Sequence, residues 1–324
     1  MSGLPWLVIV TGASRGLGRC LAQEAVRSIG KDHRMTLLLM ARSESGLMET
    51  AASIRGMNSE DVTIEVQPVD LGNLSTLETS LQNAFSGLDA RHYQRCVLFN
   101  NAGSLGELAP AMDLSFAGLR EAVDLNITSA MWVTCAFVNL ILPRWQQQQQ
   151  QQGGDSGLAE RPEGGAGQQQ QSGDAQQQPN SADSQQPQQP PPPTEAGGSG
   201  SEGAAAASMP DVVVNISSLA AVKPFPTWAA YCAGKAARDM FHAALAAEHR
   251  ASQLRVLSYA PGPLDTDMQA RIRAADGCAP ELRAFFATMQ RDGALVRPSE
   301  SAARCVRLVR EGCWECGAHV DFFD

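Results

Sequence analysis

Two hydrophobic patterns alternate along most of the chain. Short apolar runs typical of buried strands are followed by longer stretches in which apolar residues recur every three or four positions, as on one face of a helix. The predicted strands are residues 7–10, 36–41, 62–69, 96–100, 212–216 and 255–259. The predicted helices are residues 17–28, 74–85, 114–142 and 229–249, with a more polar helix that ends near residue 55.

This alternation predicts an α/β fold with a single doubly wound, Rossmann-type parallel sheet and helices on both faces. Strands joined by helices of this length pair in parallel through right-handed crossovers. Ligands bind to such sheets in the crevice beyond the carboxyl ends of the strands. We therefore expect the residues that carry chemistry to lie in the loops that follow the strands.

The alternation stops at residue 146 and resumes after residue 208. The sequence between them consists of glutamine runs, a proline run, Gly-Ser repeats and an alanine tract, with almost no large apolar residue. Such a segment cannot bury enough apolar surface to offset its chain entropy, so we expect it to be disordered. The prediction is one Rossmann-type domain made of residues 1–145 and 209–324, interrupted by a Gln/Pro/Gly-rich insert at residues 146–208.

Charge and composition argue against several partners. The net charge is −9, and residues 146–208 carry −6 of it, which argues against nucleic acid or an anionic membrane surface as the main partner. We predict no transmembrane helix and no signal peptide. The eight cysteines are scattered, mostly in apolar segments, as in reduced cytoplasmic proteins. Cys313 and Cys316 form a lone CxxC pair without further ligands, so no metal site is expected.

The loop after the first strand, residues 11–18 with the sequence TGASRGLG, indicates a dinucleotide site. Its glycines allow a tight turn and let the backbone approach a pyrophosphate at the start of the following helix. The strand before it and the helix after it are both predicted, which strengthens a motif that is weak when it stands alone. The residues expected at the cofactor are Gly12, Ser14, Arg15, Gly16, Leu17 and Gly18.

The ends of the second and third strands favour NADP(H). An NAD enzyme usually has an acidic residue after the second strand, which accepts a hydrogen bond from the ribose 2′-hydroxyl. This chain has Arg42 and Ser43 there, and with Arg15 they suit a 2′-phosphate, although Arg42 is alternatively a solvated residue at a helix start. Asp70, followed by Leu71, is placed to accept from the adenine amino group or to cap the next helix.

Ser218, Tyr231 and Lys235 form the group expected to carry the reaction. Ser218 follows a predicted strand, and Tyr231 and Lys235 lie one helical turn apart. Carbonyl reduction needs a proton donor for the oxygen that receives charge as hydride arrives. A nearby ammonium lowers the pKa of a tyrosine from about 10, and Ser218 would orient the carbonyl. A lone Tyr–Lys pair is more often a surface pair, but the serine and the glycine loop reverse that interpretation.

These motifs, together with NNAG at residues 100–103 and Pro261-Gly262, resemble the short-chain dehydrogenase/reductase family. The resemblance spans all but the insert and the C-terminal tail, and it implies an NADPH-dependent carbonyl reductase. It implies that Asn126 is a fourth catalytic residue, which supports a water beside Lys235, and that Lys235 also holds the nicotinamide ribose. Further cofactor contacts implied by the resemblance are Asn101, Leu264, Thr266, Met268 and Gln269.

Residues 213–219, 231–240, 259–268 and 317–322 resemble, more narrowly, the members of this family that reduce side-chain ketones of pterins in tetrahydrobiopterin biosynthesis. This implies that Asp321 anchors the pterin, whose 2-amino and N3–H edge presents two donors to one carboxylate. It also implies that Ser218, Tyr231 and Gly262 contact the substrate. The departures are the insert and Phe323, where these enzymes often have tyrosine. Without the flanking match, Asp321 would be interpreted as a solvated acid.

Two alternatives remain beside a pterin reductase. One is another reductase of the family that acts on steroids, quinones or diketones. Asp321 argues against it, because a hydrophobic substrate offers no donors to a carboxylate. The other is a Gln-rich scaffold protein on a vestigial reductase fold, which the intact Ser218, Tyr231 and Lys235 argue against. The helices at residues 114–142 and 229–249 carry more apolar residues than one sheet face needs. Members of the family commonly pair these helices, so we expect a cytoplasmic homodimer.

Overall fold

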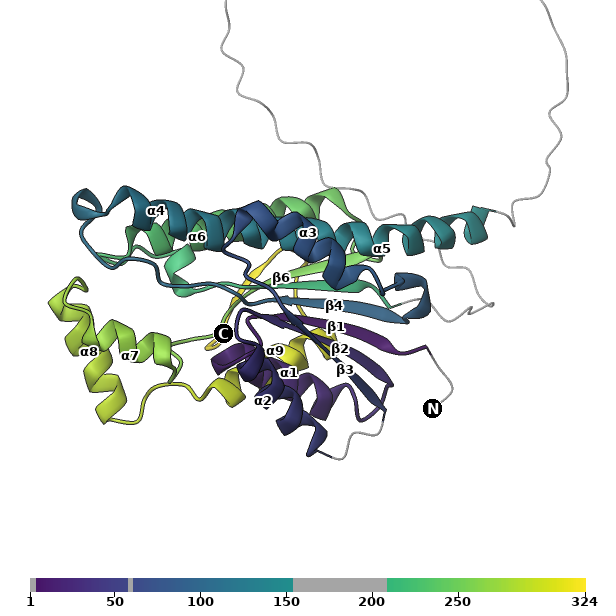
Figure 1. Cartoon of the computed structure of the whole chain (residues 1–324), viewed down its shortest axis with the longest axis horizontal. Coiled ribbons are helices and arrows are strands. Elements are labelled where there is room, and N and C mark those ends of the chain that lie inside the picture. The colour runs from purple at the N-terminus through teal and green to yellow at the C-terminus, as the bar shows by residue number, and fades with distance from the viewer. Residues whose placement is uncertain (1–3, 58–60, 154–208) are drawn as a thin grey trace, which may run out of the picture. The chain divides into compact units, whose positions relative to one another are not determined.

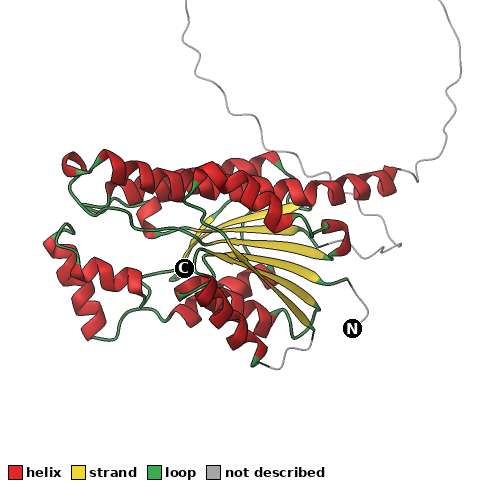
Figure 2. Cartoon of the chain, in the orientation of Figure 1, coloured by secondary structure: helices red, strands yellow, loops and turns green. Residues whose placement is uncertain are grey.

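A parallel sheet of seven strands organises the residues that the computed structural model describes, which are 4–57, 61–153 and 209–324 (Figure 2). The strand order is β3-β2-β1-β4-β5-β6-β7, and the order reverses between β1 and β4. The strands are β1 (Trp6–Thr11), β2 (Met35–Ala41), β3 (Val62–Pro68), β4 (Arg95–Asn100), β5 (Asp211–Ile216), β6 (Leu254–Ala260) and β7 (His319–Asp321). This topology confirms the predicted doubly wound α/β fold, and the reversal places a ligand crevice between the loops that follow β1 and β4.

The apolar runs of the sequence become strands because both faces of the sheet are covered. In β1, Val8 and Val10 pack into one core cluster, whereas Leu7 and Ile9 pack into another on the opposite face. Successive side chains of a strand point to opposite faces, so a strand buried on both sides needs apolar residues at every position.

Helices form a layer on each face of the sheet (Figure 1). One layer contains α1 (Gly16–Ser28), α2 (Glu44–Arg55) and α9 (Pro298–Glu311). The other contains α3 (Leu74–Phe85), α4 (Phe116–Val123), α5 (Ala130–Gly153) and α6 (Ala229–Glu248). The remaining helices, α7 (Asp267–Ala274) and α8 (Pro280–Arg291), follow the loop after β6 and lie beyond one end of the sheet in Figure 1. Single 3₁₀ turns occur at Ala90–His92, Ala111–Asp113 and Leu219–Ala221.

The helix predicted at residues 114–142 differs from its prediction in two ways. A π-helical segment, Asp124–Ser129, separates α4 from α5, and such segments are rare and often mark functional sites. In addition, α5 continues to Gly153, past the predicted insert boundary at residue 146. Glutamine has a high helix propensity, so the change of composition at residue 146 does not end the helix. The rest of the predicted insert, residues 154–208, lies outside the described residues.

Among the described residues, one helical segment, Phe116–Gln147, is long and apolar enough to cross a membrane by length and composition. The sequence predicted no transmembrane helix. Its most apolar window is 44% buried, and Val133, Phe137 and Ile141 pack against the sheet in the second core cluster. Packing against the sheet accounts for its apolar composition, as in the core helix of an α/β layer.

Residues that flank the predicted insert meet at the amino edge of the sheet. Asp211, the first residue of β5, is fully buried and accepts a hydrogen bond from the Cys96 backbone nitrogen at 2.7 Å. The same carboxylate binds Arg144 Nη2 at 2.7 Å and Trp145 Nε1 at 2.9 Å. These residues directly precede the insert, so one buried carboxylate joins the chain before it to the chain after it.

Candidate active site

The loops at the carboxyl ends of β1 to β6 line a cavity of about 800 Å³. This volume lies within the range of small-molecule and cofactor sites. Tyr231 and Lys235 reach it from α6. Most of the predicted cofactor residues line it, namely Gly12, Ser14, Arg15, Gly16, Leu17, Gly18, Arg42, Ser43, Asp70, Leu71, Asn101, Lys235, Leu264, Thr266 and Met268.

The glycine loop packs too closely to admit side chains at two positions. Gly12 has a φ of +67°, and a Cβ there would lie 2.8 Å from the Asn101 side-chain nitrogen. A Cβ at Gly18 would clash with the carbonyl oxygen of Gly12. Asn101 in turn donates to the Thr11 carbonyl at 2.9 Å, so the turn after β4 fixes the loop after β1. Both loops are thereby held at the mouth of the crevice.

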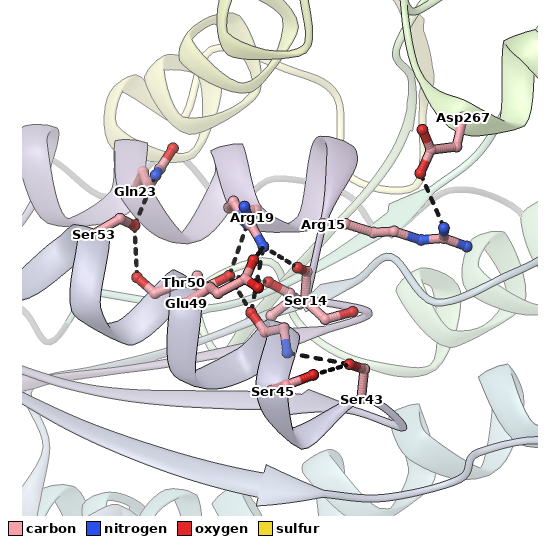
Figure 3. Close-up of polar contacts among 12 residues, drawn as sticks. Ser14, Arg15, Arg19, Gln23, Ser43, Ser45, Glu49, Thr50, Ser53 and Asp267 are labelled. Atoms are coloured by element: carbon pink, nitrogen blue, oxygen red, sulfur yellow. Dashed lines mark hydrogen bonds and ion pairs between the residues drawn. The ribbon is translucent and has the colours of Figure 1, made fainter.

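Two exposed guanidinium groups border the same cavity (Figure 3 shows one of them). Arg15 Nη1 lies 3.0 Å from Asp267 Oδ2, and both side chains are more than 70% exposed. Arg42 Nε lies 4.0 Å from Asp70 Oδ1 and is similarly exposed. Ser43 caps α2 by accepting from the Gly46 nitrogen at 3.1 Å. Exposed ion pairs of this kind are weak, so both arginines are available to an anionic ligand.

Arg19 also lines this cavity, and the sequence analysis missed it. Its Nη2 donates to the Ser14 carbonyl at 2.6 Å and to Glu49 Oε2 at 2.8 Å, while its Nε donates to Thr50 Oγ1 at 3.0 Å (Figure 3). Thr50 Oγ1 then donates to the Ala13 carbonyl at 2.9 Å. These bonds tie the glycine loop to α2. The partners on α2 lie about thirty residues away in the sequence, and no spacing rule predicts them.

The structure brings Ser218, Tyr231 and Lys235 together at the end of β5. Tyr231 and Lys235 are only 8% and 5% exposed. Lys235 Nζ donates to the Ile216 carbonyl at 2.7 Å and lies 5.7 Å from the centre of the Tyr231 ring. Ser218 does not line the cavity, but its side chain hydrogen-bonds Tyr231 and accepts from the Ala220 nitrogen at 3.1 Å. Thus a hydroxyl, a phenol and an amine converge where the cofactor cavity reaches α6.

The electrostatics of this group differ from the sequence prediction. Burial raises the pKa of Tyr231 above its usual 10, while the hydrogen bond with Ser218 and the charge of Arg238 oppose that shift. Burial, and then Arg238, hold the pKa of Lys235 well below its usual value. The pKa of Tyr231 is therefore raised, and not lowered as the sequence predicted, because burial outweighs the groups that favour the phenolate. The contribution of Lys235 to this pKa stays a prediction. The side-chain cation that favours the phenolate is Arg238.

Asn126 lies in the π-helical segment and is fully buried. Its Oδ1 accepts from the Ser104 nitrogen at 2.9 Å, and its Nδ2 donates to the Ser104 carbonyl at 2.9 Å. A Cβ at Gly234 would lie 3.1 Å from the Asn126 Cβ, so this side chain also packs directly against α6. Asn126 does not line the cavity, although its neighbour Leu125 does. Its amide holds the cavity loop at Ser104 in place.

Three further predicted residues lie outside the cavity lining. Gln269 is buried, and its Oε1 accepts from Arg273 at 3.0 Å. Gly262 has a φ of +78° and packs against Phe322 and Phe323. Asp321 ends β7, pairs in register with the last residue of β6, and accepts from the Phe323 nitrogen at 3.1 Å. Asp321 therefore lies at the carboxyl edge of the sheet, beside the Gly262 loop, but not in the cofactor cavity itself.

Within the described part of the chain, no group of three or more His, Cys, Asp or Glu residues has the arrangement of a metal site. All eight cysteines are free thiols, including Cys313 and Cys316. Cys316 Sγ accepts from the Val256 nitrogen at 3.3 Å, which gives it a structural contact beside β6.

A sequence model described as short chain dehydrogenase matches residues 7–154 and 208–277. This chain belongs to the short-chain dehydrogenase/reductase family and is an oxidoreductase of that family. It is 32% identical to sepiapterin reductase of Mus musculus over 321 residues, covering 98% of this chain and 96% of that protein. Sepiapterin reductase of Xenopus tropicalis is 31% identical, with 98% and 96% covered. Benzil reductase ((S)-benzoin forming) of Bacillus subtilis (strain 168) is 24% identical, with 94% of each chain covered.

Solved structures of distant sequence share the fold. The KRED1-Pglu enzyme superposes with a TM-score of 0.65 at 22% identity, covering 97% of this chain and 99% of that one. An actinorhodin polyketide ketoreductase solved with NADPH has a TM-score of 0.65 at 20% identity, covering 99% of this chain and 97% of that one. At such low identity these two similarities establish the fold alone.

Proposed function

We propose that this protein is an NADPH-dependent carbonyl reductase that reduces side-chain ketones of a pterin, as a step of tetrahydrobiopterin biosynthesis in the cytoplasm. The observation that carries the proposal is the convergence of Tyr231, Lys235 and the glycine loop on one cavity, with Ser218 bonded to Tyr231. The similarity to sepiapterin reductases over nearly the whole chain supports the pterin as substrate.

The residues of the cavity fit a nicotinamide dinucleotide. The tightly packed glycine loop opens the first turn of α1 to a pyrophosphate. Arg15 and Arg42 offer guanidinium groups to a 2′-phosphate, and no carboxylate stands directly after β2 to repel it. When bound, NADPH supplies the hydride. Lys235 would hold the nicotinamide ribose, a role supported by its place in the cavity lining and by its side-chain nitrogen at the end of β5, beside the Ile216 carbonyl.

The side chains at the end of β5 supply the proton. The Tyr231 hydroxyl donates to the substrate oxygen as negative charge develops on it, and the Ser218 hydroxyl orients that oxygen. Burial keeps Tyr231 protonated at neutral pH, because it raises the pKa of the phenol. The tyrosine is therefore in the form that a reduction requires. Asn126 contributes by fixing the Ser104 loop and by packing against α6 at Gly234.

Asp321 is the proposed pterin anchor, and it separates the pterin reductase from its closest alternative. We expect NADPH oxidation by the purified protein with sepiapterin and with a small diketone. Asp321→Ala and Asp321→Asn should both raise KM for sepiapterin strongly and leave diketone reduction nearly unchanged, since a diketone lacks the donor edge of the pterin. Asp321→Asn retains an acceptor for the Phe323 nitrogen. Losses on both substrates, or in the alanine variant alone, would instead indicate a role in folding the tail.

A diketone reductase is the second candidate, because the chain also matches benzil reductases along most of its length. Activity on diketones with none on sepiapterin would favour it. If the protein is a scaffold on a vestigial fold, we expect no turnover with any carbonyl compound. The substrate panel therefore separates the three functions.

We further propose a homodimer through α4, α5 and α6. Phe116, Leu119 and Val123 follow one another along one face of α4 and are exposed. Trp132 on α5 and Met240 on α6 are exposed as well. Large exposed apolar side chains on all three helices support an interface between two copies of the chain. Light scattering should give twice the 34.5 kDa mass of the chain, and a monomer at micromolar concentration would contradict the proposal.

A further inference from the structure

The shortest of the seven described strands, β7, carries the proposed pterin anchor. It consists of His319, Val320 and Asp321, and it lies at the edge of the sheet beside β6. Backbone hydrogen bonds join it to β6, such as that from the Phe322 nitrogen to the Ala260 carbonyl at 2.8 Å. A short strand at an edge has few such bonds, and a terminal segment frays unless other contacts hold it. The position of Asp321 therefore depends on what else holds β7.

One side chain of β7 reaches the helix that carries Tyr231. His319 Nδ1 lies 2.6 Å from Asp239 Oδ2 on α6, and the two side chains are 22% and 16% exposed. An ionised carboxylate only accepts hydrogen bonds, so the histidine is the donor. The hydrogen bond with Asp239 raises the pKa of His319 above its usual value, although burial opposes that shift. A charge-assisted bond that is mostly shielded from water is stronger than an exposed pair.

Asp239 is itself held in place by the sheet. Its second oxygen, Oδ1, accepts from Asn215 Nδ2 in β5 at 2.8 Å. The same amide nitrogen donates to Ser258 Oγ in β6 at 3.1 Å. Gly317, just before β7, also approaches α6, because a Cβ there would lie 3.0 Å from the Ala246 Cβ. The carboxylate thus joins β5 to β7 at a place where α6 and the start of β7 are in direct contact.

His319 and Asp321 occupy the same face of the sheet. Alternate residues of a strand point to the same side, and Val320 between them packs against the core cluster on the other face. The Asp321 carboxylate bonds within the tail, to the Phe323 nitrogen. His319 Nε2 is buried and has no hydrogen-bond partner among the described residues. The imidazole therefore holds β7 to α6 through its bond with Asp239, two residues before Asp321.

We propose that His319 is a positioning residue for Asp321, which it holds at the substrate end of the sheet by anchoring β7 to Asp239 of α6. The inference rests on the proposed function, in which Asp321 binds the pterin and Tyr231 protonates its ketone. Tyr231 and Asp239 lie about two turns apart on α6. The bond therefore fixes the substrate anchor relative to the helix of the proton donor, and reduction requires both ends of the substrate to be held at a set separation.

The test compares two substitutions of nearly the same shape. His319→Leu removes the donor, whereas His319→Asn retains an N–H donor in a side chain of the same branching. Hydrogen exchange of the peptide at residues 317–324, measured by mass spectrometry, reports the opening of β7 and needs no activity. We expect exchange to be about tenfold faster in His319→Leu, the factor that corresponds to one hydrogen bond to a charged group. His319→Asn should exchange like the wild type.

Steady-state kinetics separate positioning from a general loss of stability. KM for sepiapterin should rise about tenfold in His319→Leu, by the same energy, and stay near the wild-type value in His319→Asn. The kcat with sepiapterin, KM for NADPH and reduction of a small diketone should be nearly unchanged in both. In the Asp321→Ala background, His319→Leu should raise KM no further, because its effect passes through Asp321.

His92→Leu is the matched control. His92 Nε2 lies 3.9 Å from Asp89 Oδ2 in another His–Asp pair, and this histidine is 77% exposed. Exposed pairs contribute little, so the control should change neither the exchange of residues 317–324 nor KM for sepiapterin. Circular dichroism shows whether each variant is folded, and His319→Ala replaces His319→Leu if the latter is not.

Three results would overturn the proposal. The first is wild-type exchange in a folded variant that lacks the donor. The second is an equal loss in His319→Leu and His319→Asn, because packing of the ring and not its hydrogen bond would then hold β7. The third is a further rise of KM in the Asp321→Ala background. If the wild-type protein reduced no pterin, the proposed function would fail, and hydrogen exchange would still decide whether His319 holds β7 in place.

Discussion

Burial shifts the pKa values of three side chains on one face of α6, which are Tyr231, Lys235 and Arg238. Burial raises the pKa of the phenol and lowers that of the amine, so each group is displaced toward its neutral form. Lys235 donates a hydrogen bond to the Ile216 carbonyl. Burial also lowers the pKa of Arg238, to about 10, so its guanidinium remains charged at neutral pH. The proposed proton donor is thus a neutral phenol near pH 7, with the Ser218 hydroxyl as its hydrogen-bond partner.

Replacing Tyr231 with phenylalanine keeps the ring packing and removes the proposed acid. We expect kcat for carbonyl reduction to fall by ~10²–10⁴, the range typical of general acid catalysis. NADPH binding, measured by fluorescence titration, should persist. Tyr259→Phe is the control, since Tyr259 is also buried and its hydroxyl hydrogen-bonds to Ser301. Near wild-type turnover by Tyr231→Phe would exclude it as the donor.

Arg42 should determine the choice of cofactor. Arg42→Asp places a carboxylate after β2, where it repels a 2′-phosphate and accepts from a 2′-hydroxyl. The wild type should prefer NADPH in kcat/KM, and the variant should lose or reverse that preference. Arg55→Asp, at the opposite end of α2, changes the net charge equally and should leave the preference intact. Equal kcat/KM for both cofactors in the wild type would contradict the prediction.

Sequence reasoning recovered the residues whose relation is local and missed those whose partners are distant. Tyr231 and Lys235 were predictable because one helix fixes their spacing, and the glycine loop because one turn contains it. Arg19 and Arg238 were not, because their acceptors lie about 30 and 136 residues away. Burial of their charges also depends on how the elements pack, and no local pattern encodes that.

The sequence predicted the helices and strands in which a hydrophobic pattern continues over several residues. It did not predict very short elements or a change of helix type. Five of the six strands from β1 to β6 are mostly apolar, β3 alternates apolar and polar residues, and the positions of all six follow the prediction. β7 has only three residues, too few to show a period. α9 does carry a helical pattern, with Ala302, Cys305, Val306 and Val309 buried, so its signal was in the sequence and was overlooked. The π-helical break at Asn126 left no trace in the hydrophobic pattern.

The junction of α5 with β5 predicts a test at the scale of elements. Asp211→Asn removes the charge that compensates the buried Arg144, and we expect the free energy of unfolding to fall by about 3 kcal/mol. Urea denaturation measures it. Asp292→Asn, which breaks an exposed pair with Arg291, is the control and should change little. An equally small effect at Asp211 would show that this contact does not stabilise the junction.

At the scale of the whole molecule, the two edges of the sheet have separate tasks. The carboxyl edge holds the cavity, with Ser217 and Pro261 among the residues that follow its strands. The amino edge holds Asp211, Arg144 and Trp145, which join the chain before residue 146 to the chain after residue 208. The six-residue strand β5 separates the two edges by about 20 Å at the usual rise per residue. We propose that the fold tolerates the insert because the insert begins and ends far from the chemistry.

Excision of the insert tests this proposal. Replacing residues 146–208 with a short Gly-Ser turn should leave kcat and both KM values within about twofold, because the ligand crevice lies at the opposite edge. A second variant that removes only residues 154–208 keeps α5 complete to Gly153. Its kcat and KM values should match those of the first variant. Closing a shorter loop costs less chain entropy, so the free energy of unfolding should rise by about 0.6 kcal/mol for each halving of loop length.

Limited proteolysis of the intact chain provides an independent measurement of the same separation. A segment of this composition should be cut rapidly, while residues 1–145 and 209–324 survive as two fragments that stay associated through the sheet. The nicked protein should retain reductase activity, since Asp211 still binds Arg144 and Trp145 from the other fragment. If excision abolished activity in a protein that remained folded, residues 146–208 would have to contribute directly to the site, and the division of tasks between the two edges of the sheet would be wrong.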